Sequence, residues 1–322
     1  MKILITGGAG FIGSNLAHYL LALDGEVMVI DDLSSGYSGN IDPRSEFRKL
    51  DICRDEFLAA SAAFDPDVIV HLAAQSSVSI GETEPEFTRK INVDGTRRVI
   101  EAAIASDVER LVFASSAAVY GVPQELPLVE TAPLAPINVY GETKLAGEEL
   151  IREMLDPTAL DYALLRFSNV YGPRQTAEGE GGVVSCFCEA LAKGKTPVIF
   201  GDGHQVRDFV YVADVVEALT STIGGDIAFR DFGAEATEDT SDDRGVFNIS
   251  SGHPVTIEQL LNGMRVPANF GGSATFEPER PGDIRESILS PRKAREVFEW
   301  EANIDLAQGL DNTWMWHWRQ MQ

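Results

Sequence analysis

A glycine-rich segment near the N-terminus, Ile5-Thr-Gly-Gly-Ala-Gly-Phe-Ile-Gly13, constrains the fold more than any other part of the sequence. It follows an apolar, β-rich run at residues 2–6 and leads into a stretch with helical periodicity at residues 11–23. Glycines allow a tight turn and let backbone N–H groups approach a pyrophosphate at the N-terminus of the following helix. A strand, a glycine turn and a helix in this order predict a dinucleotide-binding unit, and a glycine turn without a ligand is the alternative.

The alternation of strands and helices continues through the first half of the chain. Further β-rich runs lie at residues 27–31, 68–74, 110–116 and 163–168, with a weaker candidate at 47–52, and further helical stretches lie near 86–105 and 140–155. Near-continuous apolar strands separated by helices indicate a parallel sheet that is buried on both faces. Right-handed crossovers make such a sheet doubly wound. We therefore expect an α/β fold in which residues 1–168 form a Rossmann domain that binds NAD.

The composition of the sequence and the length of its expected elements change after about residue 168. Strands and helices become short, and glycine, proline and charged loops become frequent. We expect residues 169–322 to form a smaller α+β domain that binds the substrate. Within it, residues 209–223 have the pattern of a strand and a helix that pack back on the first domain, and the acidic stretch 224–245 is expected to be an exposed insertion.

The charge balance excludes some classes of partner. The chain has 50 acidic and 26 basic residues, a formal net charge of −24. Nucleic acids and anionic membranes require faces rich in Lys and Arg, so we expect neither as a partner. Only 7 of the basic residues are Lys. Many acidic residues with few Lys are typical of proteins from salt-accumulating halophiles, where dissolved salt screens the self-repulsion; an ordinary acidic cytosolic enzyme is the alternative.

Cysteine, histidine and hydropathy patterns exclude further classes. The three Cys and five His are scattered, without the spacing of a disulfide framework or a zinc site, so we expect no metal. The first strand pattern starts at residue 2, which leaves no room for a signal peptide, and no apolar run reaches 18 residues. We expect a cytoplasmic protein.

An acidic residue ends the second β-rich run. Asp31 follows Gly13 by 18 residues, where a carboxylate can accept hydrogen bonds from both ribose hydroxyls of adenosine. Because the same carboxylate would repel a 2′-phosphate, Asp31 favours NAD over NADP.

Three further residues have the chemistry of a catalytic site. Tyr140 and Lys144 lie four residues apart on a predicted helix and share a face. An ammonium beside a phenol lowers the pKa of the phenol from about 10, as a base near neutral pH requires. A surface helix pair is the alternative, although Lys is scarce in this chain. Ser116 ends the run 110–116, at the sheet edge where ligands bind, and a cap or turn residue is its alternative.

Several motifs in this order resemble those of the extended short-chain dehydrogenase/reductase family, in its nucleotide-sugar epimerase/dehydratase group. They are TGGAGFIG, DDLSSG, HLAAQ, SSAAVYG, YGETK, RFSNVYGPRQ, GDGHQVRDFVYV and RPGD, and they cover nearly the whole chain except 224–245. The resemblance implies bound NAD, a UDP-sugar substrate and transient oxidation of the sugar at C4. Members are often homodimers that pair helices matching 89–105 and 140–155, so we expect a homodimer.

The resemblance also assigns roles to matching positions. The implied catalytic residues are Ser116, Tyr140 and Lys144. The implied cofactor-binding residues are Gly7, Gly10, Phe11, Ile12, Gly13, Asp31, Asp51, Ile52, Ala73, Ala74, Tyr140 and Lys144. The implied substrate-binding residues are Ser116, Asn169, Phe200, Arg207, Arg280 and Ser287. Among these, Asn169, Arg207 and Arg280 match residues that clamp the diphosphate of the nucleotide sugar, and Phe200 matches an aromatic residue that packs on its base. Asn92 matches a residue near the cofactor or serves the structure, and Arg174 either joins the clamp or pairs with a surface Asp.

Departures from relatives indicate the reaction. The 4,6-dehydratases carry Asp-Glu where this chain has Ala117 and Ala118, and UDP-glucuronate decarboxylases use a Glu in place of Ala118. Epimerisation needs neither carboxylate, so the Ala-Ala pair favours a 4-epimerase, and the resemblance then implies UDP-glucose and UDP-galactose as its substrates. Ser287 stands where some family epimerases place a bulky Tyr, which predicts activity on UDP-N-acetylglucosamine as well. The alternatives are a UDP-glucuronate 4-epimerase, a 4-keto reductase, a 4,6-dehydratase or a non-catalytic NAD-binding regulator.

Overall fold

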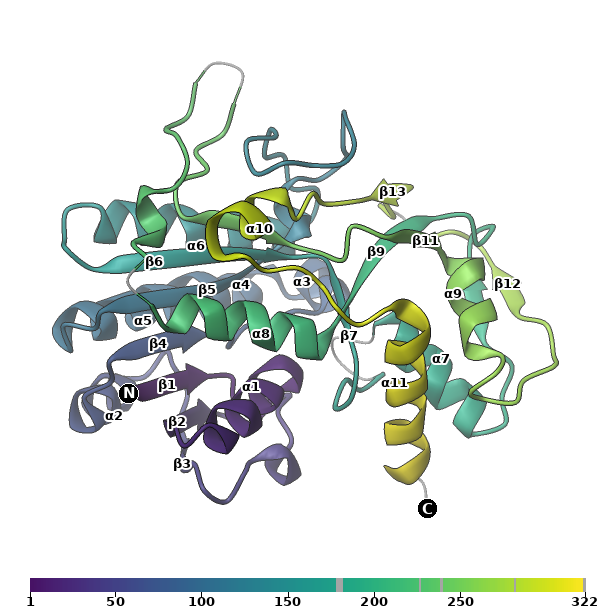
Figure 1. Ribbon diagram of the computed structural model, residues 1–322, viewed down its shortest axis with the longest axis horizontal. Coiled ribbons are helices and arrows are strands. Elements are labelled where there is room, and N and C mark those ends of the chain that lie inside the picture. Colours follow the sequence, from purple (N-terminus) through teal and green to yellow (C-terminus); the bar gives the residue numbers. More distant parts are fainter. Residues whose placement is uncertain (178–181, 226, 238–239, 281, 321–322) are drawn as a thin grey trace.

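The computed structural model describes residues 1–177, 182–225, 227–237, 240–280 and 282–320. A larger part built around a parallel sheet lies on the left of Figure 1, and a smaller part that includes the C-terminal helix lies on the right. Among the described residues, no helix is long and apolar enough to cross a membrane.

A seven-stranded sheet forms the centre of the larger part (Figure 1). Its strands in spatial order are β10 (Val246–Ile249), β6 (Asp161–Phe167), β5 (Arg110–Ser116), β4 (Val68–His71), β1 (Lys2–Thr6), β2 (Glu26–Asp31) and β3 (Glu46–Lys49). All neighbouring strands are parallel. The predicted doubly wound α/β fold is therefore confirmed.

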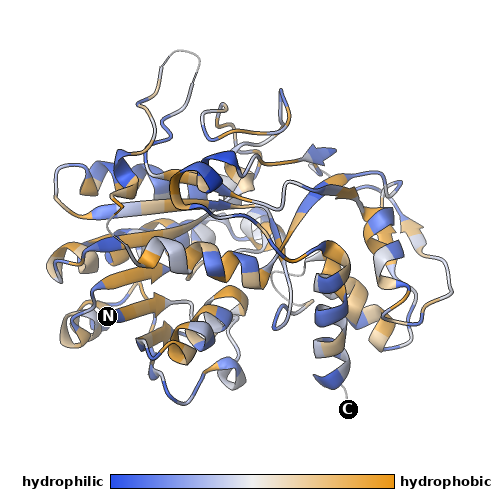
Figure 2. Ribbon diagram, in the orientation of Figure 1, coloured by the Kyte–Doolittle hydropathy of each residue, from blue (hydrophilic) through white to orange (hydrophobic). Residues whose placement is uncertain are grey.

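Helices cover both faces of the sheet because successive side chains of a strand point to opposite faces. Ile3 and Ile5 of β1 belong to one buried cluster, and Leu4 belongs to the other. The helices of the first cluster are α1 (Phe11–Ala22), α8 (Val212–Ile223) and α10 (Arg292–Phe298). Those of the second are α2 (Asp55–Phe64), α5 (Gly95–Ala105) and α6 (Val139–Leu155). Figure 2 shows strands of this sheet coloured as hydrophobic between the helices.

The strand order reverses at the middle of the sheet. From β1 the order runs to β2 and β3 on one side, and from β4 to β5 and β6 on the other. Loops that leave the carboxyl ends of β1 and β4 therefore part in opposite directions and leave a crevice, which is where open α/β sheets bind ligands.

The chain returns to the sheet after the expected boundary at residue 168. Strand β10 pairs with β6 at one edge. Helix α8 packs against α1 and contributes Val215 and Leu219 to the same buried cluster as β1. The larger part thus takes a strand and a helix from the second half of the chain, while the division into an NAD domain and a substrate domain stays a prediction.

The smaller part combines short strands with three helices. A four-stranded sheet joins β11 (Pro254–Thr256), β9 (Val206–Tyr211), β13 (Glu286–Ser287) and β7 (Asn169–Tyr171), and β8 (Val198–Phe200) pairs with β12 (Thr275–Glu277). The helices are α7 (Val183–Ala192), α9 (Ile257–Met264) and α11 (Leu306–Gln320). Helix α9 starts at a capping box in which Thr256 and Gln259 each bond the other's backbone. Leu260, Phe187 and Trp314 pack together in the core of this part.

The predicted helix near 86–105 is divided into three. It comprises α4 (Pro85–Arg89), a π-helical turn η2 (Lys90–Asp94) and α5, and a short helix α3 (Val78–Thr83) precedes it. Asn92 lies inside the π-helical turn and bonds both the N–H and the carbonyl of Gln75. This tertiary contact coincides with the change from α- to π-helical winding.

The acidic stretch 224–245 is not exposed throughout, contrary to expectation. Residues 231–237 are exposed, but Phe229 is fully buried against Phe247 and Phe298. Asp243 is also buried and pairs with Lys293. Residues 226, 238 and 239 of this stretch lie outside the described residues. The remaining short helical turns of the chain are η1 (Ser38–Asn40), η3 (Ala117–Val119) and η4 (Phe229–Asp231).

Candidate active site

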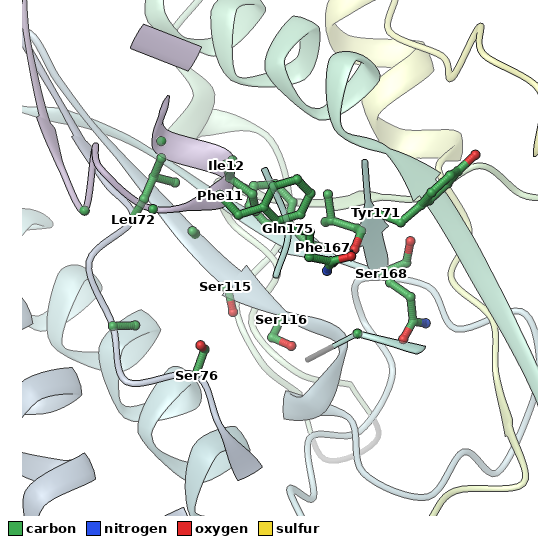
Figure 3. A pocket seen from close by; sticks show the side chains of 18 of the residues that line it. Phe11, Ile12, Leu72, Ser76, Ser115, Ser116, Phe167, Ser168, Tyr171 and Gln175 are labelled. Carbon is green, nitrogen blue, oxygen red and sulfur yellow. Dashed lines mark hydrogen bonds between the residues drawn. The ribbon is translucent and has the colours of Figure 1, made fainter. Parts of the chain in front are cut away.

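Two adjoining cavities lie at the carboxyl edge of the sheet, where the strand order reverses. The first has a volume of about 290 Å³ and is shown in Figure 3. The second has a volume of about 350 Å³. Both are lined by Gly7, Gly10, Leu72, Ala74 and Ser76, so the glycine turn lies between them.

The glycine turn is packed too closely for side chains. Gly7 has a φ of +72°, and a Cβ on it would lie 2.7 Å from the backbone nitrogen of Ala73. A Cβ on Gly13 would lie 2.4 Å from the carbonyl oxygen of Gly7. Helix α1 begins after Gly10 with no side-chain cap and no acidic residue in its first turn. Its N-terminus is therefore suited to an anion, since the backbone dipoles favour negative charge there.

Asp31 closes the second cavity beside this turn. Its carboxylate accepts hydrogen bonds from the backbone N–H groups of Ala9 at 3.0 Å and Leu33 at 2.8 Å. Burial raises the pKa of Asp31 above its ordinary value, and the two backbone bonds oppose this shift. Asp51 and Ile52 line the same cavity, from the loop after β3.

The two cavities fit a dinucleotide. Each of the twelve residues predicted to bind the cofactor lines at least one of them. The shared glycine turn and helix N-terminus suit a pyrophosphate, and the cavities on either side suit the two nucleoside halves. Asp31 lines the second cavity and not the first.

Ser116, Tyr140 and Lys144 all line the first cavity, as the sequence predicts. Tyr140 and Lys144 come from the first turns of α6, where Asn138 caps the helix by accepting the N–H of Gly141 at 2.8 Å. The Lys144 ammonium is 5.9 Å from the centre of the Tyr140 ring. It also donates to the carbonyl of Ala114 on β5 at 2.7 Å.

Ser116 is a cap residue that also faces the first cavity. It caps η3 by accepting the N–H of Ala118 at 3.2 Å, and it lines the cavity. Helix α6 approaches this turn closely, because a Cβ on Gly141 would lie 2.6 Å from the Ala118 carbonyl. The wall therefore presents a hydroxyl, a phenol and an ammonium, which together can hold an oxygen and move a proton.

The predicted substrate residues divide into two groups. Asn169 lines the first cavity, and its amide donates to the carbonyl of Asp208 at 3.1 Å. Phe200, Arg207, Arg280 and Ser287 line neither cavity. They form two pairs in the smaller part: the Arg280 guanidinium lies 4.0 Å from the centre of the Phe200 ring, and Ser287 is opposite Arg207 in the β13–β9 pairing.

The structure also shows the contacts of three residues whose roles the sequence left open or assigned to the diphosphate, Arg207, Arg174 and Asn92. Arg207 bonds the carboxylate of Asp283, and Pro281 of the same RPGD motif lies outside the described residues. Arg174 donates to the side chain of Asn15 at 3.2 Å. Asn92 lines neither cavity and bonds Gln75 and Thr143 instead, which favours its structural reading.

Several lining residues have no role in the sequence-based prediction. In the first cavity they include Ser168, Tyr171, Gln175, Val183, Val184 and Phe209. Ser168, Tyr171 and Gln175 follow the carboxyl end of β6, while the other three are on α7 and β9, and the strand pattern does not resolve such an edge into individual side chains. Gln175 is inside the motif RFSNVYGPRQ, and this position in a motif is the only sequence feature that could have indicated a place in the cavity wall.

Comparisons with known proteins agree with this geometry. Residues 3–224 match the model of the NAD dependent epimerase/dehydratase family. A UDP-glucose 4-epimerase of Mycolicibacterium smegmatis is 39% identical over 319 residues, which cover 97% of each chain.

Two solved structures are also similar to the chain over nearly its whole length. The UDP-glucose 4-epimerase of Thermotoga maritima with UDP-glucose is 35% identical, covers 100% of both chains and has a TM-score of 0.91. The UDP-glucose 4-epimerase of Thermus thermophilus in complex with NAD is 34% identical, covers 98% of this chain and 99% of that one, and has a TM-score of 0.87.

Proposed function

The chain belongs to the NAD-dependent epimerase/dehydratase family, and from this premise we propose that it is an isomerase that interconverts UDP-glucose and UDP-galactose by inverting C4 of the sugar. One observation carries this proposal. Ser116, Tyr140 and Lys144 line one wall of a cavity whose other wall is the glycine turn of a dinucleotide site.

NAD, when bound, supplies the oxidant that takes a hydride from C4 and returns it. The glycine turn and the N-terminus of α1 would hold its pyrophosphate. Asp31 would accept the adenosine ribose hydroxyls, while Asp51 and Ile52 would border the adenine. Ala73 and Ala74 would line the path between the two halves.

The chain's own residues manage the proton and the oxygen at C4. Tyr140 as a phenolate removes the proton of the 4-hydroxyl and later gives it back. The neighbouring Lys144 ammonium favours the phenolate form. Its bond to the Ala114 carbonyl holds the ammonium in the cavity wall. Ser116 donates a hydrogen bond to the 4-oxygen and steadies it through the reaction.

The same wall argues against dehydration. Eliminating water from the sugar requires an additional acid and base near the ring. Ala117 and Ala118 follow Ser116, and the described lining of the first cavity contains no Asp or Glu. Epimerisation needs neither group, since the oxidised sugar only has to turn and receive the hydride on its other face.

A cofactor-free assay tests the proposed function. The purified protein is incubated with UDP-glucose without added NAD, the sugar is followed by NMR, and nucleotide is released with acid. We expect UDP-galactose to appear and NAD to be released. Tyr140→Phe should lower kcat by about 10²–10⁴-fold. A protein that produces no UDP-galactose but consumes added NADH stoichiometrically would instead be a reductase.

We propose that Arg207 and Arg280 clamp the diphosphate of the nucleotide sugar, because guanidinium forks match phosphate oxygens. Phe200 then packs on the nucleotide base, and the Asn169 amide binds the diphosphate together with the two guanidinium groups. Ser287 leaves space for a 2-acetamido group, so UDP-N-acetylglucosamine is a further substrate. Ser287→Tyr should remove turnover of this sugar and spare UDP-glucose; equal turnover of UDP-N-acetylglucosamine by both proteins would contradict the role of Ser287.

Two proposals concern the molecule as a whole. The net charge of −24 makes the protein halophilic, with stability that rises with KCl to molar levels. A homodimer through α5 and α6 would cover the exposed Ile104 of α5. Thermal unfolding over a KCl series and sedimentation at each concentration test both, and full stability of a monomer in dilute buffer would contradict both.

A further inference from the structure

A buried histidine lies behind the cofactor wall and has no part in the mechanism described above. His71 is the last residue of β4 and is 1% exposed. Both of its ring nitrogens are engaged: Nδ1 lies 2.7 Å from the Thr6 hydroxyl oxygen, and Nε2 lies 2.9 Å from the Thr96 hydroxyl oxygen. Both threonines are buried as well. Since buried polar groups are stable only when they are paired, the donors and acceptors of this group can be assigned.

The partners of the two threonines determine which ring nitrogen carries the proton. Thr96 donates its single hydroxyl proton to the carbonyl of Asn92 at 2.6 Å, so its oxygen has to accept a proton from Nε2 of His71. The Thr6 hydroxyl oxygen accepts the backbone N–H of Ala73 at 3.3 Å, which leaves its own proton for Nδ1. Burial lowers the pKa of His71 to about 3, so the ring is neutral near neutral pH. His71 is therefore the tautomer with a proton on Nε2 and a bare Nδ1.

This series of hydrogen bonds continues to the helix that carries Tyr140. The Asn92 side-chain amide donates to the Thr143 hydroxyl oxygen at 2.9 Å, and Thr143 donates its own proton to the backbone carbonyl of Tyr140 at 2.8 Å. Asn92 also bonds the N–H and the carbonyl of Gln75. Because each hydroxyl in the series has one proton to give, every member depends on the orientation of the next.

The other end of the series lies at the glycine turn. Thr6 directly precedes Gly7, and Ala73 lines the second cavity. A Cβ on Gly7 would lie 2.7 Å from the backbone nitrogen of Ala73, so the turn and this wall are in direct contact. The series therefore connects the cofactor wall with the backbone of Tyr140, and His71 is the member that joins β1 to α5.

We propose that His71, through its Nε2 proton, is a positioning residue that holds the cofactor wall at Ala73 in a fixed place relative to the helix that carries Tyr140. The inference rests on the proposed function, in which the cofactor and Tyr140 act on the same carbon of the sugar. A misplacement of about 1 Å can lower a rate about 100-fold. His71 lines neither cavity, so it acts through its partners and not on the substrate.

NMR of the wild-type protein reads the tautomer directly. Protein with isotopically labelled histidine nitrogens is recorded near neutral pH, and His71 is identified by its through-space contacts to Phe113, whose ring centre is 5.6 Å away. We expect a protonated Nε2 and an unprotonated Nδ1, which differ in nitrogen shift and in coupling to the ring protons. A proton on Nδ1, with or without one on Nε2, would overturn the assignment.

Two substitutions of Thr96 separate hydrogen bonding from packing. Thr96→Val keeps the shape of the side chain and removes the acceptor of Nε2, whereas Thr96→Ser keeps the hydroxyl and removes a methyl group. For Thr96→Val we expect kcat with UDP-glucose to fall about 10–100-fold and KM to change less than about threefold. For Thr96→Ser we expect kcat within about threefold of the wild type. Thr222→Val is the matched control, because Thr222 is buried and donates to the carbonyl of Leu219 on α8. Its kcat should be unchanged.

Three kinetic results would overturn the positioning role. The first is an equal kcat in Thr96→Val and the wild type. The second is a lower kcat in Thr96→Ser than in Thr96→Val, which would show that the methyl group matters and the hydroxyl does not. The third is the same loss in Thr222→Val. All rates are scored on protein shown to be folded by circular dichroism in high KCl. A wild type that forms no UDP-galactose would refute the proposed function instead, and the tautomer is read without turnover and without any variant.

Discussion

A buried ion pair next to the candidate active site gives the sharpest stability prediction. Glu148 lies one helical turn after Lys144 on α6, and its carboxylate accepts Arg166 Nε at 2.9 Å and Nη2 at 2.7 Å. Both side chains are 0% exposed. Ser115, which is directly before Ser116, donates to the same carboxylate. The Arg166 contacts thus tie α6, which carries Tyr140, to β6, and the Ser115 bond ties α6 to the end of β5 that carries Ser116.

The expected cost depends on whether one or both charges are removed. Burial raises the pKa of Glu148, but the Arg166 guanidinium outweighs it and holds the net pKa below its ordinary value. Glu148→Gln leaves a buried guanidinium unpaired, which costs about 3–5 kcal/mol. Arg166→Met leaves a buried carboxylate and costs about the same. Glu148→Gln/Arg166→Met removes both charges, so we expect a loss of about 1–3 kcal/mol from the Tyr120 hydroxyl and the Glu130 carbonyl that Arg166 contacts.

Denaturant unfolding of the four proteins at constant high KCl measures this coupling. The matched control is Arg292→Ala, which breaks a pair with Glu296 whose side chains are 80% and 57% exposed. It should change the free energy of unfolding by less than about 1 kcal/mol. A double variant that loses the full sum of the two single losses would refute the reasoning, because it would show that the two charges do not compensate each other.

Two further perturbations follow from the structure. Gly13→Ala should lower the free energy of unfolding by about 2–3 kcal/mol, because the added Cβ would lie 2.4 Å from the Gly7 carbonyl oxygen. Gly10→Ala, whose Cβ would lie 3.2 Å from the same oxygen, should cost less than about 1 kcal/mol and mainly weaken NAD binding. Equal unfolding midpoints for the two variants would contradict this expectation. Burial lowers the pKa of His71 to about 3, so the unfolded chain binds a proton between about pH 6.5 and 3 that the folded chain does not, and stability falls as the pH drops through this range. His71→Gln should flatten that loss in acid-unfolding curves, and an unchanged slope would argue against a neutral buried imidazole.

Local patterns predicted the strands and the glycine turn well because their causes are local. The strands at residues 2–6 and 110–116 are found with these bounds, because a short uninterrupted apolar run is typical of a strand that is buried on both faces of a parallel sheet. The glycine spacing predicted the turn because Gly13 is required by the Gly7 carbonyl within the same turn, although Gly7 itself is required by the distant backbone of Ala73.

Other features depend on contacts between distant segments, which no local pattern reports. Strand β10 is only four residues long and joins the sheet through β6, about eighty residues earlier. The π-helical turn at Asn92 depends on Gln75. The importance of Glu148 arises from Arg166 on β6, and the first cavity forms only where β5, β6 and α6 come together.

The most direct test of the proposed reaction is the fate of the hydrogen at C4. UDP-glucose that carries deuterium at C4 is converted in ordinary water, and the UDP-galactose is analysed by NMR and mass spectrometry. We expect the deuterium to be retained at C4, since the hydride that leaves the sugar returns to the same sugar without exchanging with water. Loss of the label to water would contradict transient transfer of the C4 hydride to bound NAD.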